Sequence, residues 1–257
     1  MKITKYTLAA MLALLLSMST VVAQEDDPEQ QVQKSPSDIT AEQWSLFNRD
    51  GEGSIGVQGW LQMGYHNKST GGFNQHPNRF NVHQLWLAFD RLAVDEGEGL
   101  NLGYHLDVMY GVDASETQSF GNNAGKFDFQ SGLDNGIYGW AIPQLYAEAR
   151  VGDMLVTLGH FSSPLGVENV AAPNNIFYSH SLTMYNTAPR THTGVMVTRP
   201  VGDVEVYLGW TLGWDSGFDQ LGSGNSGLAG FSKRVSEKVG VSYMTSFGDL
   251  GHRGVGY

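Results

Sequence analysis

The 257-residue sequence contains no cysteine, so disulfide bonds and thiol chemistry are excluded. A small extracellular domain held together by disulfides is therefore excluded as well. A soluble secreted domain and a membrane-embedded sheet both remain compatible with this absence.

The sequence also lacks a long hydrophobic run after residue 23, whereas a transmembrane helix needs about 20 apolar residues. The apolar stretch 6–16 is too short to span a bilayer. It follows Lys2 and Lys5 and precedes a small-residue site that ends at Ala23. This order is typical of a cleavable signal peptide, so we predict a signal peptide over 1–23 and export of the remainder.

Basic side chains are scarce. There are 15 lysines and arginines against 26 aspartates and glutamates, which makes nucleic acid an unfavourable partner. Many of the acids lie in 24–53, a polar segment without a strand period that we interpret as a periplasmic lead-in to a domain at 54–257. Residues 48–55 loosely match the start of a calcium loop, but Gly59 stands where the last ligand should be glutamate. A plain loop entering a strand is therefore favoured over a calcium site near Asp50.

From residue 54 onward, apolar and polar residues alternate with a period of two, which indicates β-strands. Several runs are about as long as membrane strands, which need roughly 9–11 residues, whereas globular strands cluster near 5–6. In the clearest run, 100–112, apolar side chains alternate with polar and small ones, as expected of a sheet with one wet face. The predicted strands are 55–65, 84–90, 100–112, 144–151, 154–158, 192–198, 204–214, 227–234 and 239–247.

The connections between these strands alternate between long and short. Outer-membrane barrels have short periplasmic turns and longer outer loops, whereas a soluble sandwich has no reason to sort its loops in this way. The pattern therefore predicts an all-β, antiparallel transmembrane β-barrel of a Gram-negative cell outer membrane. The long connections lie near 67–80, 113–140, 162–190 and 215–226, and the short ones near 91–99, 152–153, 199–202 and 236–238.

Nine strands are an odd number, whereas bacterial single-chain barrels have an even number of strands. An unclosed sheet in lipid would leave backbone groups without hydrogen bonds, at several kcal/mol each. We therefore expect residues 251–257 to begin a further strand and the barrel to be truncated before closure.

Several segments resemble a known family. The residues that carry the resemblance are 159–168 (GHFSSPLGVE), 175–179 (NIFYS), Pro189, 192–195 (HTGV), 59–65 (GWLQMGY) and 103–108 (GYHLDV). Together they resemble the β-barrel porin family of OmpL-like channels, over nearly all of 54–257. The resemblance implies an outer-membrane pore, often of unassigned substrate, and chains that are usually longer than this one.

The interleaved polar residues and one long connection supply the candidates for a pore lining and a constriction. The connection 162–190 is stiffened by prolines and is predicted to fold toward the lumen, with Glu168 facing Arg150 or Arg190. Such a charged ring would set selectivity by electrostatic barriers. An exposed, variable outer loop is the alternative, and the sequence leaves both open. The candidates are Gln62, His105, Asp107, Glu148, Arg150, Glu168, Arg190 and His192.

None of the eight histidines has a metal-ligand spacing. His105 and Asp107 share one strand face and are expected to be solvated lumen groups, although their side chains could converge. His160, His180 and His192 flank one long loop and could gather there. No metal site and no cofactor are predicted.

Catalysis has little support in the sequence. Ser162 and Ser163 near His160 are the nominal nucleophiles, but no glycine-flanked nucleophile elbow accompanies them. No catalytic residue is predicted.

The expected function is passive diffusion of small hydrophilic solutes or ions, with a mild cation preference from the acidic composition. A plugged barrel with a binding or structural role, a barrel-embedded hydrolase and a soluble carbohydrate-binding sandwich are the alternatives. The expected partners are outer-membrane lipid and small hydrophilic solutes. A monomer and an oligomer are both compatible with the sequence.

Overall fold

A computed structural model describes residues 55–93, 99–236, 239–253 and 255–256. The predicted signal peptide (1–23), the lead-in (24–53) and the loop at Asp50 lie outside the described residues. All of the described residues belong to one compact unit, 40–257.

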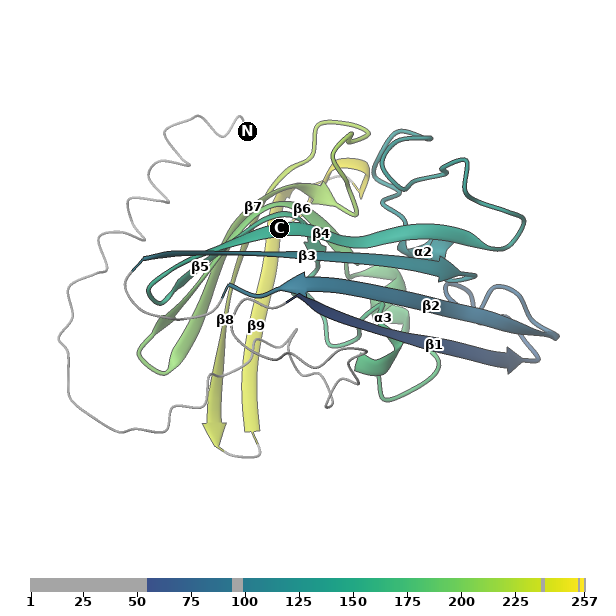
Figure 1. Cartoon of the computed structure of the whole chain (residues 1–257), viewed down its shortest axis with the longest axis horizontal. Helices are drawn as coiled ribbons and strands as arrows, with labels where there is room; N and C mark the ends of the chain where they lie inside the picture. Colours follow the sequence, from purple (N-terminus) through teal and green to yellow (C-terminus); the bar gives the residue numbers. More distant parts are fainter. Residues whose placement is uncertain (1–54, 94–98, 237–238, 254, 257) are drawn as a thin grey trace. The chain divides into compact units, whose positions relative to one another are not determined.

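The described residues form one antiparallel sheet in which every strand pairs with its neighbours in the sequence (Figure 1). Its strands are β1 (Gly56–His66), β2 (Arg79–Arg91), β3 (Leu100–Gly111), β4 (Gly139–Val151), β5 (Met154–Ser162), β6 (Thr191–Val201), β7 (Val204–Trp214), β8 (Asn225–Ser236), β9 (Val239–Asp249) and β10 (Val255–Gly256). The short helices are α2 (Ala114–Thr117), α3 (Leu182–Asn186) and the 3-10 turns η2 (Ala172–Asn174) and η3 (Gly251–Arg253).

The prediction of an all-β fold with about nine long antiparallel strands in one unclosed sheet is confirmed. Within the described residues, β1 pairs with β2 alone and the short β10 pairs with β9 alone. The tenth strand falls where the sequence predicted a further one. None of the described helices is long and apolar enough to cross a membrane.

Several strands are longer than predicted, since β2 begins at Arg79, β4 begins at Gly139 and β5 ends at Ser162. One short turn also differs. The prediction ended β6 before Arg199, but β6 continues through Val201, and Pro200 lies opposite Glu205 of β7. Pro200 has no N–H to donate, but it lies beyond the last pair between β5 and β6, Leu155↔Thr198, so that no hydrogen bond to β5 is lost. The chain then reverses at Gly202, whose φ of 63° suits a two-residue hairpin turn.

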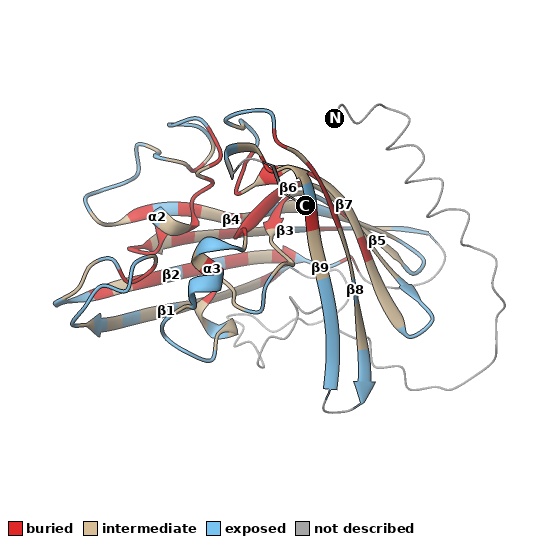
Figure 2. Cartoon of the chain, turned by 180° about the vertical axis from the view of Figure 1, so that it is seen from behind, coloured by how far each residue is buried: buried red, intermediate tan, exposed pale blue. Residues whose placement is uncertain are grey.

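The two faces of the sheet have opposite character, and the apolar one is exposed. On β3, Leu100 and Leu102 are 64 % and 57 % exposed, whereas Asp107 and Met109 are 2 % and 0 % exposed. Neighbouring strands follow the same alternation, so polar groups gather on the inner face while leucine, valine and tyrosine cover the outer face. Figure 2 shows buried and less buried residues as bands along β2 and β4. This arrangement is the reverse of a soluble sheet and matches the wall of a membrane barrel.

The inner face of β2, β3 and β4 is covered by chain from the long connections. Residues 163–190, here called the inner loop, contain η2 and α3, and α2 begins the connection from β3 to β4. Apolar side chains of these segments pack with inward-facing residues of the strands. The resulting cluster comprises Phe73, Trp86, Ala88, Met109, Ala114, Ala141, Val170, Ala171 and Met184.

Strands β4 and β5 diverge at their outer ends. Their pairing runs from Val151↔Met154 to Leu145↔His160 and stops there. Beyond that point the Asp128 carboxylate accepts hydrogen bonds from the backbone N–H groups of Ile142 (2.9 Å) and Ser119 (3.0 Å). The connection from β3 to β4 therefore satisfies backbone groups that a neighbouring strand would otherwise satisfy.

Candidate functional site

Gln84 joins the inner loop to the inner face of β2. Its amide nitrogen donates to the Val170 carbonyl oxygen at 2.8 Å and to Asp113 Oδ2 at 3.0 Å. Its amide oxygen accepts from Trp60 Nε1 and from the Ala172 backbone N–H, both at 3.0 Å. The side chain is almost fully buried, so these four bonds satisfy it. The inner loop is thus held across the inner face of β2.

A second link between the inner loop and β2 runs through His83. The Tyr178 hydroxyl lies 2.5 Å from His83 Nε2, and His83 Nδ1 lies 2.9 Å from Asp113 Oδ1. Burial raises the pKa of the Asp113 carboxyl, and the hydrogen bonds from His83 and Gln84 oppose that rise. His83 and Gln84, adjacent on β2, therefore both hold Asp113 while each also contacts the inner loop.

Arg190, at the end of the inner loop, is buried rather than exposed to a pore. Its Nη2 lies 3.1 Å from Glu116 Oε2, and 4 % of its side chain is exposed. The guanidinium carbon lies 5.8 Å from the ring centre of Phe73 and 5.6 Å from that of Phe120, which adds cation–π attraction. The backbone N–H of Arg190 donates to Asp215 Oδ1 at 2.7 Å. Arg190 therefore ties the inner loop to α2 and to the connection after β7.

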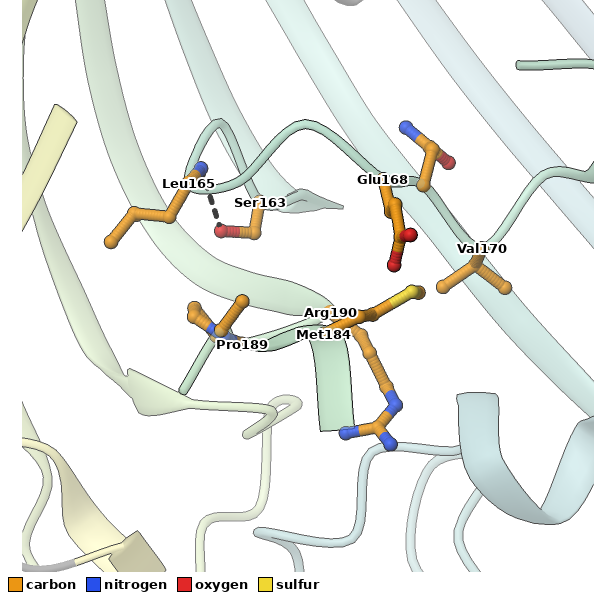
Figure 3. Close-up of a pocket in the computed structure, with 9 residues that line it drawn as sticks. Ser163, Leu165, Glu168, Val170, Met184, Pro189 and Arg190 are labelled. Atoms are coloured by element: carbon orange, nitrogen blue, oxygen red, sulfur yellow. Dashed lines mark hydrogen bonds between the residues drawn. The ribbon is translucent and has the colours of Figure 1, made fainter. Parts of the chain in front are cut away.

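The predicted pairing of Glu168 with Arg150 or Arg190 is wrong. The Glu168 carboxylate accepts hydrogen bonds from the backbone N–H and the hydroxyl of Ser181, at 2.8 and 2.9 Å. Figure 3 shows Glu168 and Arg190 around one small pocket, with the Arg190 guanidinium directed away from Glu168. Ser181 is the N-cap of α3, so Glu168 stabilises the start of that helix, while 29 % of its side chain remains exposed.

Next to Glu168, His180 Nδ1 lies 4.0 Å from the carboxylate. Burial lowers the pKa of His180, and the charge of Glu168 opposes that shift. His180 also packs on Phe73, with ring centres 4.7 Å apart. The histidine is therefore held neutral near pH 7 inside the packing of the inner loop.

His105 and Asp107 do converge. His105 Nε2 lies 2.8 Å from Asp107 Oδ1, and Gln144 of β4 donates to Asp107 Oδ2 at 2.7 Å. The Tyr146 ring stacks on His105, with centres 5.2 Å apart and planes inclined by 8°. These groups form a polar cluster on the inner face of β3 and β4.

Glu148 and Arg150 continue along the inner face of β4. Both contact the backbone of Ala93, which accepts a hydrogen bond from Arg150 Nε at 2.9 Å and donates one to Glu148 Oε2 at 3.4 Å. Gln62 lies on the inner face of β1, opposite Gln84, and is partly exposed. These three predicted residues therefore share the inner face with His105 and Asp107.

His192 is fully buried, so it contacts protein rather than open lumen. Its Nε2 lies 3.2 Å from the Ser163 hydroxyl, and its Nδ1 lies 3.4 Å from the Gly213 carbonyl oxygen. A serine protease-like triad would need a carboxylate where Gly213 stands. The Ser–His contact therefore lacks the third group that would orient a catalytic base.

Of the histidines that flank the inner loop, His160 and His192 lie close together on the neighbouring strands β5 and β6. His160 Nδ1 lies 2.7 Å from the Thr193 hydroxyl, while His180 packs against Phe73. Among the described residues, no group of three or more histidine, aspartate or glutamate side chains could hold a metal ion.

The sequence reasoning missed Gln84, Asp113, Glu116 and Tyr178 as anchors of the inner loop. Gln84 carried a usable signal, because it occupies an inward position of an alternating strand. The other three lie in connections without a period, and their partners are far apart in the sequence.

A comparison with family models matches residues 54–254 to the family described as "Putative beta-barrel porin-2, OmpL-like". The chain belongs to this β-barrel porin family. No curated protein and no solved structure gave a match. Membership supports a porin-type β-barrel, of which this sheet is part of the wall.

Proposed function

We propose that the protein is an outer-membrane channel for passive diffusion of small hydrophilic solutes or ions. The observation that carries this proposal is the reversed sheet. Its outer face exposes leucine, valine and tyrosine, while its inner face carries hydrogen-bonded polar groups. Membership in a family of porin-type barrels supports a role in passive transport without catalysis.

The charges on the inner face favour a mild cation preference. Asp90 and Asp107 are buried beneath the inner surface of β2 and β3, Glu148 on β4 is partly exposed there, and Arg150 is a nearby basic group. Fixed carboxylates along a lumen lower the electrostatic barrier for cations and raise it for anions. The inner loop narrows the passage beside these groups, since it crosses the inner face of β2.

A plugged barrel is the second candidate. It is favoured by the apolar cluster on the inner face, in which Val170, Ala171 and Met184 of the inner loop pack against Trp86 and Met109. A barrel filled by such packing would present its outer loops to a partner and conduct little.

Swelling of vesicles distinguishes these two functions. Full-length protein is folded into lipid vesicles loaded with impermeant polymer and diluted into neutral sugars of increasing mass. A diffusion channel lets small sugars enter faster than large ones, without saturation. Protein that is inserted but admits no sugar would favour the plugged barrel.

Glu168 provides a second test at the inner loop. Its carboxylate is partly exposed, and Glu168→Gln removes the charge while retaining an acceptor for Ser181. We expect the reversal potential in a salt gradient to move toward that of a non-selective pore. The matched control is Asp203→Asn in the short turn between β6 and β7, which is exposed and lies away from the inner loop. An unchanged reversal potential in Glu168→Gln would show that Glu168 does not contribute to ion selectivity.

A further inference from the structure

The outer face of the sheet carries an apolar hollow across β4, β5, β6 and β7, with a volume of about 510 Å³. One wall is a row of four residues, each paired with the next: Ala147↔Leu158, Leu158↔Val195 and Val195↔Trp210. All four side chains take the outward positions of their strands. The row therefore spans four strands on the face that a porin turns toward lipid.

The floor of the hollow exposes backbone rather than side chains. Gly159 and Gly194 are paired directly across β5 and β6, and both line the hollow. A Cβ on Gly194 would lie 2.1 Å from the Trp210 carbonyl oxygen, and Gly159 has a φ of +140°. Larger residues are therefore excluded at both positions, and the backbone of the glycine pair forms the floor.

The outer end of the hollow is closed by an aromatic side chain. Phe218, in the connection from β7 to β8, lines the hollow and packs edge-on against Phe127, with ring centres 5.2 Å apart. Below it, the Trp210 indole N–H is satisfied by Asn225 Oδ1 at 2.6 Å. The indole thus presents its apolar surface to the hollow and its polar edge to the end of the sheet with long loops, as tryptophans at membrane interfaces do.

The chemistry of the lining selects an apolar occupant. No residue that lines the hollow carries a formal charge, and the lining is almost wholly aliphatic or aromatic. A hollow of this kind does not hold ordered water well, because water needs two to four polar partners. Leu145, which borders the hollow, is 39 % exposed and is paired with Leu106 of β3, so the hollow is continuous with the apolar outer face.

We propose that this hollow binds one acyl chain of a membrane lipid. The inference rests on the proposed location of the barrel in a membrane. The acyl chain lies over the glycine pair and along the Ala147–Trp210 row, and its headgroup lies near Phe218 at the level of the long loops. Because the acyl chain is already in hydrocarbon, close van der Waals packing against the hollow favours the binding.

Photolabelling tests the site. Full-length protein is folded into phosphatidylcholine vesicles that contain a lipid with a diazirine on one acyl chain, illuminated and digested. We expect several-fold more label on peptides from β5 and β6 than on the peptide that contains β3. Even labelling of all outward strands would overturn the proposal.

Two matched substitutions sharpen the result. Ala147→Trp fills the hollow from its wall, so label on β5 and β6 should fall to the level found on β3. Leu102→Trp adds the same ring to an outward position on β3, outside the hollow, and should leave the labelling unchanged. Unchanged labelling in Ala147→Trp would overturn the proposal, and so would cross-links at the hollow to a second copy of the chain.

Failure of the site is distinguishable from failure of the proposed function. Resistance of the folded protein to protease and to extraction by alkali reports insertion in each sample. Protein that does not insert contradicts the membrane channel itself. Inserted protein with evenly distributed label contradicts the acyl-chain site and leaves the channel intact.

Discussion

Replacing Gln84 with methionine removes the amide that holds the inner loop on β2 while keeping a side chain of similar length. Two of its four hydrogen bonds go to the loop, at Val170 and Ala172, and two go to Trp60 and Asp113. Because the amide is almost fully buried, water does not replace these partners while the loop stays in place.

The expected effect follows from the bonds to the loop. A typical intramolecular hydrogen bond contributes about 0.5–1.5 kcal/mol net, so the two bonds contribute about 1–3 kcal/mol to loop docking. That range corresponds to a change of about 5–150-fold in the ratio of docked to released loop. The link from Tyr178 to His83 remains, so release is partial.

Limited proteolysis and single-channel recording report the release. Phe177 is 72 % exposed on the inner loop, so chymotrypsin should cut there faster in Gln84→Met than in the unmodified protein. The channel should also show larger or noisier conductance. Gln58→Met is the matched control, because Gln58 lies on the inner face of β1 and bonds to Asp90 rather than to the loop. Equal cleavage and equal conductance in a folded Gln84→Met protein would refute the anchoring role.

Three further predictions concern the faces, the buried ion pair and pH. Leu106→Arg, on the outer face near the middle of β3, should lower the free energy of unfolding in urea by about 2–4 kcal/mol. His105→Arg, on the inner face, should change ion selectivity with little loss of stability. The same loss of stability in both variants would contradict the assignment of the two faces. Glu116→Ala leaves the Arg190 guanidinium buried without its carboxylate partner. The free energy of unfolding in urea should fall by about 3 kcal/mol, which is at the low end for a broken buried ion pair because Glu116 is partly exposed. Burial lowers the pKa of His180 below 6.5, so as the pH falls this histidine is protonated in the unfolded chain before it is protonated in the folded protein. The free energy of unfolding should therefore fall as the pH drops below about 6.5. His180→Asn should make the free energy of unfolding, measured in urea at a series of pH values, depend less on pH. An unchanged slope would mean that another group carries the pH dependence.

The strands could be predicted from the sequence because each one carries its own signal. The alternation from Leu100 to Gly111 is complete within β3, and the structure follows it residue by residue. The turn at Gly152 is similarly local, since a left-handed φ of 55° favours glycine. The order of the strands in the sheet could also be predicted, since every strand pairs with its neighbours in the sequence.

The contacts of the inner loop could not be predicted in the same way. Gln84 and Val170 are 86 residues apart, and no period links an amide on a strand to a carbonyl in a loop. Glu168 was expected to face an arginine because charge alone was visible in the sequence. In the structure this carboxylate instead accepts a hydrogen bond from Ser181, the N-cap of α3, which lies only 13 residues further along the chain.

Single-channel conductance of the native full-length protein in a planar bilayer tests the central claim most directly. We predict steady steps of ion current with a modest preference for cations over anions, as proposed for a channel whose inner face carries more acidic than basic side chains. Silence from protein that is demonstrably folded and inserted would contradict the channel.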